Sequence, residues 1–265
     1  MNKLDEIVAY KRVEVAGSKE ELPFESVIEK MVQLPPTDDF ASALKLHNPD
    51  ECVCIAELKK ASPSKGIIAK SFSPEKIARE YKQGGAAALS VLTDKKYFQG
   101  HPNFISAAKG ASHLPILRKD FIVDEYQIYE SRMIGADALL LIVAALTDQQ
   151  LQSYLSTAEE LTLSALVECH SKEEIDRALN AGAKIIGINN RDLQSFTVDV
   201  GLSLNLKRFI PNDCVSVSES GIRNFHTVER LVQAGFDAIL VGEHLMTQPD
   251  KAKAIRELLG KPVPV

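Results

Sequence analysis

Apolar residues recur along the chain in two alternating sets of short runs. In the first set each run follows a glycine suited to end a helix, and the four glycines stand 50, 47 and 53 residues apart: Gly85, Gly135, Gly182 and Gly235. The runs of the second set lie between them and end in charged residues: 54–59, 115–120, 164–168 and 215–219. Short apolar runs of this kind are typical of strands that are buried on both faces of a sheet. The pattern therefore predicts eight strands in a parallel sheet.

The segments between the predicted strands have the periodicity of helices. Apolar residues recur at helical spacing over 74–83, 124–134, 148–160, 172–181 and 225–234. Eight units of strand and helix, each of about 25 residues, predict an α/β fold of the closed (βα)8 type, a TIM barrel. A doubly wound open sheet is the alternative. It is disfavoured because the segment after the first strand, KKASPSKG at 59–66, lacks the glycine-rich turn that binds dinucleotides.

Residues 1–48 precede the first predicted strand and carry helical patterns of their own, over 4–15 and 24–32. Because the barrel, residues 49–265, closes without them, this N-terminal helical extension either caps one end of the barrel or forms an interaction surface. We expect the cap, since the apolar stripes of both helices need a neighbouring surface to bury against. The chain is then a single domain with an extension.

The composition fits a globular protein and limits the kinds of partner. The chain has 265 residues, of which 45% are hydrophobic and 25% charged, and its formal net charge is -5. No block of like charge supports binding to nucleic acid or to a membrane surface. The first residues lack an apolar signal segment, and no run has the length of a membrane span. We therefore expect a cytoplasmic protein, and a monomer because the pattern contains no further apolar interface.

The cysteines and histidines do not form a recognisable metal motif. Each of the four cysteines lies within an apolar run, and none belongs to a Cys-x-x-Cys pair: Cys52, Cys54, Cys169 and Cys214. No two histidines stand four residues apart, as the helical two-histidine zinc motif requires. We therefore expect reduced cysteines in the core and no metal.

Ionisable residues stand at the ends of the odd-numbered predicted strands, where the active sites of such barrels form. They are Glu57 and Lys59 on the first strand, Lys119 on the third, Glu168 on the fifth and Glu219 on the seventh. Any one of them is equally well explained as a solvated charge at the rim. If all of them line the mouth of one barrel, they must pair with one another, because buried charges are stable only when they are paired and hydrogen-bonded. We therefore expect a polar site at this end of the barrel, to which the sixth strand adds Asn189 and Arg191.

The loops after the seventh and eighth strands have the character of a phosphate site. SESG at 218–221 and VGEHLM at 241–246 place small residues at the strand ends, and we expect short helices after both, where backbone N–H groups bind phosphate. Ser62 and Lys65 of the first loop are further candidates. Because the charge of Glu243 repels a phosphate dianion, we expect backbone contacts there, with the Glu243 side chain turned away.

Six motifs, in this order, resemble the indole-3-glycerol phosphate synthase family, and the resemblance covers nearly the whole chain, including the N-terminal extension. They are IAELKKASPS at 55–64, LSVLTDKKYFQG at 89–100, LRKDFI at 117–122, LVE at 166–168, GINNRDL at 187–193 and SESGI at 218–222. The resemblance implies conversion of 1-(2-carboxyphenylamino)-1-deoxyribulose 5-phosphate into indole-3-glycerol phosphate, carbon dioxide and water, a lyase step of tryptophan biosynthesis without a metal or organic cofactor. The implied partner is a phosphorylated small molecule.

The chemistry of this reaction accounts for the residue types at the strand ends. Attack of the carboxylated ring carbon on the ketone builds up negative charge on the ketone oxygen, which an ammonium group stabilises and protonates. After carbon dioxide is lost, elimination of the hydroxyl needs an acid, and restoring the aromatic pyrrole needs a base. Two ammonium groups and at least one carboxylate are therefore required.

The resemblance also implies a role for each candidate residue. Lys119 matches the principal general acid and Glu168 a catalytic carboxylate, while Glu57 and Lys59 match a pair that serves the dehydration and the phosphate side; the division of acid and base roles among these four stays open. The matches that orient the substrate are Asn189, Arg191 and Glu219, and those near its ring are Phe98 and Phe121. The phosphate-binding positions are occupied by Ser220, Gly221, Gly242 and Glu243.

Two other functions fit the same fold. A phosphoribosylanthranilate isomerase needs a catalytic Cys early on the first strand and an Asp on the sixth, whereas this chain has Asn189 on the sixth, and Cys54 stands three residues before Glu57, too deep for the mouth. A phosphate-binding barrel without catalytic activity, or a scaffold that acts through its N-terminal helices, is expected to have lost some of the acids and bases. Lys59, Lys119 and Glu168 are all present, which favours the synthase.

Overall fold

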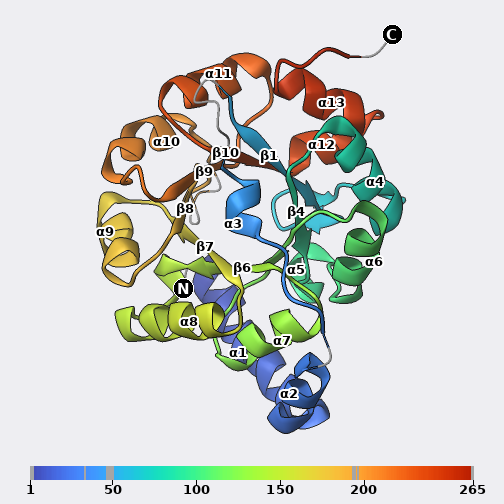
Figure 1. The fold of residues 1–265 in the computed structure, drawn as a ribbon, viewed down its shortest axis with the longest axis vertical. Coiled ribbons are helices and arrows are strands. Elements are labelled where there is room, and N and C mark those ends of the chain that lie inside the picture. The colour runs from blue at the N-terminus through green and yellow to red at the C-terminus, as the bar shows by residue number, and fades with distance from the viewer. Residues whose placement is uncertain (1–2, 33, 46–50, 193–194, 196, 264–265) are drawn as a thin grey trace.

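Eight parallel strands form a closed barrel, as the apolar pattern predicts (Figure 1). The computed structural model describes residues 3–32, 34–45, 51–192, 195 and 197–263. The barrel strands are β1 (Val53–Leu58), β4 (Ala88–Leu92), β5 (Ile116–Lys119), β6 (Ala138–Ile142), β7 (Ser164–Cys169), β8 (Ile185–Asn189), β9 (Val215–Glu219) and β10 (Ala238–Val241). The first of them, β1, closes the barrel by pairing with both β4 and β10. The alternative of a doubly wound open sheet is therefore wrong.

Helices surround the barrel on the outside (Figure 1). They are α4 (Pro74–Gly84), α5 (Lys95–Phe98), α6 (Asn103–Ser112), α7 (Tyr126–Met133), α8 (Asp148–Glu160), α9 (Lys172–Asn180), α10 (Gly201–Leu206), α11 (Phe225–Gln233), α12 (Glu243–Thr247) and α13 (Lys251–Leu258), with short 3-10 turns at η1 (Val143–Ala145) and η2 (Lys207–Phe209). Local sequence explains several boundaries. The Ser73 hydroxyl caps α4, and Thr147 with Gln150 forms a capping box at α8. Gly85 follows the last residue of α4 as its C-cap, and its φ of 92° favours glycine.

The loop after β1 contains a small hairpin that the apolar pattern does not predict. Strands β2 (Ala61–Ser62) and β3 (Gly66–Ile67) pair in antiparallel fashion, and Gly66 has a φ of 66°. Strands this short produce no alternation of apolar and polar residues that a sequence pattern can reveal. The hairpin keeps Ser62 close to the end of β1.

Helix α3 (Phe40–Ala43) closes the amino-terminal end of the barrel and lies over its opening in Figure 1. Phe40 and Leu44 are completely buried, and they pack with side chains from the beginnings of the strands, such as Val53 and Ala88. Asp39 caps this helix by accepting a hydrogen bond from the Ser42 backbone N–H. The polar side chains of the barrel collect at the opposite end, where the strands finish.

The N-terminal extension also contains α1 (Lys3–Glu21) and α2 (Phe24–Val32), which confirm the two predicted helices, although α1 continues beyond the predicted 4–15. Val15 and Val27 pack with Tyr126 of α7. The predicted boundary between extension and barrel, at residues 48 and 49, lies outside the described residues. Within the part of the chain that the structure describes, no helix has both the length and the hydropathy needed to cross a bilayer.

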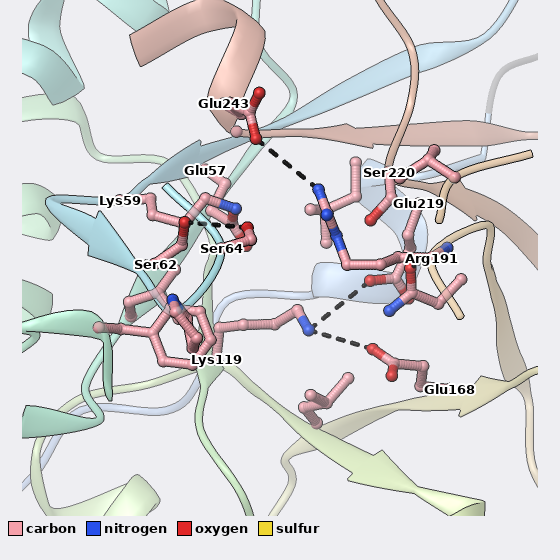
Figure 2. A pocket seen from close by; sticks show the side chains of 18 of the residues that line it. Glu57, Lys59, Ser62, Ser64, Lys119, Glu168, Arg191, Glu219, Ser220 and Glu243 are labelled. Carbon is pink, nitrogen blue, oxygen red and sulfur yellow. Dashed lines mark hydrogen bonds and ion pairs between the residues drawn. The ribbon is translucent and has the colours of Figure 1, made fainter. Parts of the chain in front are cut away.

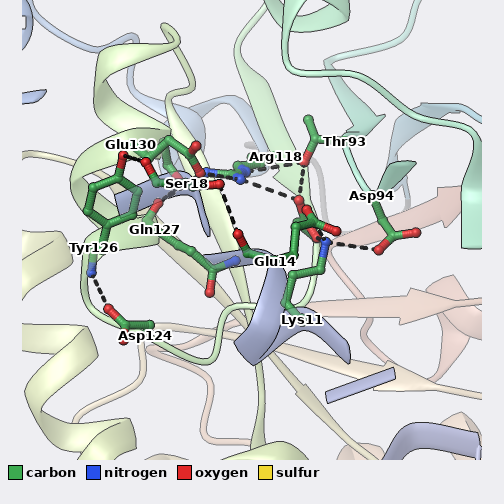
Figure 3. A network of polar contacts seen from close by, with 12 residues as sticks. Lys11, Glu14, Ser18, Thr93, Asp94, Arg118, Asp124, Tyr126, Gln127 and Glu130 are labelled. Carbon is green, nitrogen blue, oxygen red and sulfur yellow. Dashed lines mark hydrogen bonds and ion pairs between the residues drawn. The ribbon is translucent and has the colours of Figure 1, made fainter. Parts of the chain in front are cut away.

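A buried network of charges ties α1 to the loops that carry the site (Figure 3). The Lys11 ammonium lies 2.9 Å from Asp94 after β4, 2.9 Å from Asp120 after β5 and 3.1 Å from Glu14, and Lys11 is 1% exposed. Arg118 lies 3.3 Å from the other oxygen of Asp120. Buried charges paired in this way hold their elements in one arrangement, because separating them leaves an uncompensated charge.

Candidate active site

One pocket opens at the carboxyl ends of the barrel strands, and every residue predicted for the site except Lys65 lines it. From the strand ends and the loops after them come Glu57, Lys59, Ser62, Phe98, Lys119, Phe121, Glu168, Asn189, Arg191, Glu219, Ser220, Gly221, Gly242 and Glu243. Parallel strands of a closed barrel all finish at one end, so residues far apart in the sequence meet there. The tertiary structure thus assembles in one cavity what the sequence presents as separate motifs.

Lys119, the last residue of β5, extends across the mouth of the barrel between two carboxylates (Figure 2). Its Nζ atom lies 3.1 Å from Glu168 Oε2 at the end of β7 and 3.7 Å from Glu219 Oε2 at the end of β9. Both carboxylates are buried. One ammonium group therefore lies between two acidic side chains, and it can balance the charge of only one carboxylate.

The protonation states of Lys119 and Glu168 follow from this arrangement. Burial by itself lowers the pKa of Lys119, but the nearby carboxylates of Glu168, Glu219 and Glu57 outweigh it, so its pKa is raised above the ordinary value. Burial raises the pKa of Glu168, but Lys119, His170 and a hydrogen bond from Asn189 outweigh it and lower that pKa. At neutral pH Lys119 is an ammonium and Glu168 a carboxylate.

Glu219 is in a different state from Glu168, although both face the same lysine. Its Oε1 atom is buried and has no hydrogen-bond partner among the described residues. Burial is the main reason why its pKa is raised to about 8; Lys119 opposes this rise, and repulsion by Glu168 adds to it. Gly187 on β8 leaves the space that this side chain occupies, because a Cβ atom there would overlap Glu219 Oε1. The pair of carboxylates is thus divided into a charged and a protonated member at neutral pH.

Glu57 and Lys59 form a second ion pair, on the β1 side of the pocket. Lys59 Nζ lies 2.5 Å from Glu57 Oε2, and the Ser90 hydroxyl lies 3.5 Å from Glu57 Oε1. Gly242 packs directly against this carboxylate, since a Cβ atom at that position would overlap Glu57 Oε2. The glycine after β10 is therefore required by the position of Glu57.

The loop after β9 carries Ser220 and Gly221 in a tight turn. Both residues have positive φ, 68° and 80°. The Asn190 side chain donates hydrogen bonds to the Ser220 carbonyl and to the Ser218 hydroxyl, each at 3.1 Å, and so holds this conformation. The short helix expected after this strand is absent from the described loop, because the chain runs on to Asn224, which caps the longer helix α11. The expectation is confirmed only after β10, where α12 begins at Glu243.

The Glu243 side chain is not turned away, and this expectation was wrong. Its carboxylate lies 3.6 Å from Arg223, 3.7 Å from Arg191 and 3.9 Å from Lys65, and Figure 2 shows it directed at Arg191. The physical reason is attraction: three cations surround this corner, and a carboxylate beside them is favoured. The corner is positively charged although the protein as a whole is negative.

Two aromatic rings flank the pocket on the side of Lys119. Phe98 at the end of α5 and Phe121 after β5 have their ring centroids 6.2 Å apart, with an interplanar angle of 36°. Asp94 fixes the first of them by accepting hydrogen bonds from the backbone N–H groups of Tyr97 and Phe98. An apolar wall of this kind suits an aromatic ring.

Several residues of the pocket were not predicted from the sequence. Leu4 and Ile7 of α1 add an apolar surface, and Arg223 adds a cation. The apolar periodicity of residues 4–15 predicts burial but does not say against what, so only the packing of α1 reveals this contact. Arg223 stands two residues after the SESG motif, and that proximity was the available signal. His170 lies behind Glu168, with Nε2 3.6 Å from Glu168 Oε1.

Cys54 is completely buried and does not line the pocket. It belongs to the apolar layer between the strands and the surrounding helices, and burial raises the pKa of its thiol. The isomerase alternative, which needs a reactive thiol at the mouth, is therefore not supported. Within the described residues, no group of three or more His, Cys, Asp or Glu side chains is placed to hold a metal ion.

Comparison with known sequences gives close matches along the whole barrel. Residues 4–258 match the family model described as indole-3-glycerol phosphate synthase. An indole-3-glycerol phosphate synthase of Chloroherpeton thalassium is 51% identical over 251 residues, covering 93% of this chain and 95% of that protein. Those of Chlorobium luteolum and Legionella pneumophila strain Paris are 48% and 47% identical, covering 100% and 97% of this chain and 98% of each relative.

Solved structures show the same fold at low sequence identity. A thiamine phosphate pyrophosphorylase from Pyrococcus furiosus superposes with a TM-score of 0.58 and 17% identity, covering 79% of this chain and 95% of that one. A mandelate oxidase variant superposes with a TM-score of 0.59 and 14% identity, covering 90% of this chain and 85% of that one. These likenesses show the fold alone, whereas the sequence matches extend over residues 4–258, which include the motifs around the pocket. The chain belongs to the indole-3-glycerol phosphate synthase family.

Proposed function

We propose that this protein closes the indole ring, converting 1-(2-carboxyphenylamino)-1-deoxyribulose 5-phosphate into indole-3-glycerol phosphate, carbon dioxide and water. The reaction is a decarboxylation followed by a dehydration, which makes the protein a carboxy-lyase of tryptophan biosynthesis. Family membership supports the reaction, and the arrangement of charges in the pocket supports the roles of individual residues.

The observation that carries the proposal is the Lys119 ammonium, held 3.1 Å from Glu168 and 3.7 Å from Glu219 at the mouth of the barrel. The neighbouring Glu168 carboxylate keeps this lysine protonated, as a general acid requires. When the ring carbon attacks the ketone, Lys119 stabilises the developing charge on the ketone oxygen and protonates it.

The later steps need a base and a second acid. We assign the base to Glu168, which is ionised at neutral pH and removes the proton whose loss restores the aromatic pyrrole. The Glu57 and Lys59 pair, on the opposite side of the pocket, serves the elimination of the hydroxyl, with Lys59 as the second ammonium group. Glu219 and Asn189 orient the substrate, the former as a protonated carboxyl group that is able to donate a hydrogen bond.

The phosphate and the ring of the substrate have separate places in this proposal. The phosphate binds beside Ser220, Gly221 and Gly242, where Arg191 and Arg223 supply positive charge. Glu243 neutralises these cations and must give way to the dianion, while Ser62 contributes from the hairpin loop. The aromatic ring lies against Phe98 and Phe121.

We also propose that residues 1–48 cap the barrel and that the protein acts in the cytoplasm as a monomer. Leu4 and Ile7 support the cap, since they reach the pocket from α1. The exposed large apolar residues of the described chain, among them Val13, Phe24 and Phe225, are distributed over different helices, strands and loops, which gives no support to a single broad apolar face. The sedimentation coefficient of the purified protein at micromolar concentration tests whether the protein is a monomer.

The test of the function is a fluorescence assay for the indole product with purified protein and synthetic substrate. The chain contains no Trp, so its own emission hardly interferes. We expect indole fluorescence and carbon dioxide to appear together in equal amounts. A folded protein that binds the substrate and releases neither product would contradict the proposal and favour a phosphate-binding barrel without catalytic activity.

A further inference from the structure

His170 is a buried ionisable residue to which the proposed reaction steps give no role. It follows β7 directly, in the bend before α9, and does not line the pocket. Its Nε2 atom lies 3.6 Å from Glu168 Oε1, whereas Lys119 Nζ lies 3.1 Å from the other carboxylate oxygen. The Glu168 carboxylate therefore has a cation on the pocket side and an imidazole on the side away from the pocket.

Glu174 of α9 holds the other edge of the imidazole ring. Its Oε2 atom lies 3.4 Å from His170 Nδ1 and accepts a hydrogen bond from the His170 backbone N–H at 2.7 Å. Ser171 caps α9 by accepting a hydrogen bond from the Glu174 backbone N–H. Because the backbone places Glu174 in this way, the ring between it and Glu168 is confined to one position.

The surroundings of His170 favour its charged form. The side chain is 16% exposed, and neither ring nitrogen makes a hydrogen bond of good geometry with a described residue. The titratable groups that face it most closely are acidic: Glu168 on β7, Glu174 on α9 and Glu219 on β9. Burial lowers the pKa of His170, but these carboxylates outweigh it and the net shift is upward.

We propose that His170 is a positioning residue of the reaction, which orients the Glu168 carboxylate from behind and supports its charge. The proposal rests on the proposed function, in which Glu168 acts as the base. With one oxygen beside Lys119 and the other beside His170, the carboxylate is held against rotation and keeps Oε2 directed into the pocket.

The need for a second cation follows from the proposed order of events. When Lys119 transfers its proton to the substrate, Glu168 loses its main counter-charge while it is still buried. A buried carboxylate without a cation takes up a proton readily and is then no base. The His170 imidazolium keeps Glu168 ionised until the step in which the base is needed.

The test is the pH dependence of turnover in His170→Gln and Glu174→Gln. Removing the imidazolium raises the pKa of Glu168, so the acid limb of the kcat profile should move to higher pH by about one unit in His170→Gln. Glu174→Gln keeps the histidine and lowers its pKa, and its shift should have the same direction and be smaller. KM should change by less than about twofold in both, because the substrate site is intact. His226→Gln is the control, since His226 faces Glu229 at 3.5 Å on the exposed surface of α11.

A measurement on the wild-type protein keeps the proposal open to refutation if His170→Gln does not fold. The imidazole resonances of His170, followed by NMR, should titrate above the ordinary pKa of about 6.5. A titration at or below that value, or folded variants of His170 and Glu174 whose pH profiles coincide with that of His226→Gln, would overturn the proposal. An inactive wild-type protein whose His170 titrates as expected would refute the proposed function but leave the ionic pairing of His170 intact.

Discussion

Lys119 Nζ lies 3.1 Å from Glu168 Oε2, so that an ammonium group at the end of β5 and a carboxylate at the end of β7 meet across the mouth of the barrel. Each keeps the other in its charged form although Glu168 is buried and Lys119 is largely shielded from solvent. The acid and the base of the proposed reaction therefore depend on one another, and replacing either one changes the state of both.

Replacing Lys119 by Met removes the ammonium and keeps most of the apolar stem. We expect turnover to fall by about 100-fold or more, because the general acid is lost, while circular dichroism and the melting transition show a folded protein. Lys172→Met is the control, since Lys172 pairs with Asp176 on the exposed surface of α9. A folded Lys119→Met enzyme with nearly normal turnover would remove the basis of the assignment.

Glu168→Gln distinguishes the two roles that a carboxylate has beside Lys119. If Glu168 is the base, the decarboxylated but still hydroxylated intermediate should accumulate in a single turnover, as detected by mass spectrometry, because proton removal is blocked. If Glu168 only holds Lys119 protonated, unreacted substrate should remain and the pH profile should shift. We expect the intermediate to accumulate, and its absence would contradict the assignment of Glu168 as the base.

Inorganic phosphate should compete with the substrate at millimolar concentration, and binding should weaken as salt is added. The reason is that a net negative protein attracts an anionic substrate only through local cations, such as Arg191 and Arg223. Inhibition is measured as a rise in KM, with chloride at equal ionic strength as the control. If phosphate and chloride act alike, the proposed phosphate site beside β9 and β10 is wrong.

Glu219→Gln should stabilise the folded protein at alkaline pH. The folded-state pKa of Glu219, about 8, lies above its ordinary value of 4.5. The stabilisation of the folded protein by the protonated Glu219 side chain is therefore complete below pH 4.5 and is lost as the pH rises through 8. Glutamine does not titrate. The free energy of unfolding of the variant relative to wild type should therefore increase by about 3 kcal/mol between pH 6 and pH 9 in urea titrations. An exposed control, Glu229→Gln, should show no such trend.

Lys11→Met should destabilise the protein by about 3 to 5 kcal/mol, because it leaves Asp94 and Asp120 buried without their shared cation. Burial raises the pKa of Asp120, but Lys11 and Arg118 outweigh this effect, and the net shift is downward. The stabilisation by the ionised Asp120 is therefore present above the ordinary pKa of 3.8 and is lost as the pH falls through the lowered pKa of the folded protein. The difference between variant and wild type in urea unfolding should accordingly shrink in acid. Lys76→Met, which breaks an exposed pair with Glu80, should change stability by less than about 0.5 kcal/mol.

The architecture was predictable because most barrel strands begin as short apolar runs, with polar residues mainly at their ends, and helical patterns lie between them. Strand β1 has all six of its residues buried, and such a run is distinct even in a single sequence. The hairpin of β2 and β3 was missed because two residues per strand form no pattern, and α1 was predicted too short because its later turns are largely exposed.

The sequence by itself determined the eight strands, the end of the barrel at which the polar residues gather, and most of the polar residues around the pocket. These depend on the alternation of elements and on the rule that parallel strands finish at one end of a barrel. Only the tertiary structure decided how the charges pair. The different charge states of Glu168 and Glu219, the place of Glu243 among three cations, and the contact of His170 with Glu168 all depend on distances of a few ångströms and on burial, and neither quantity is encoded in the spacing of residues along the chain.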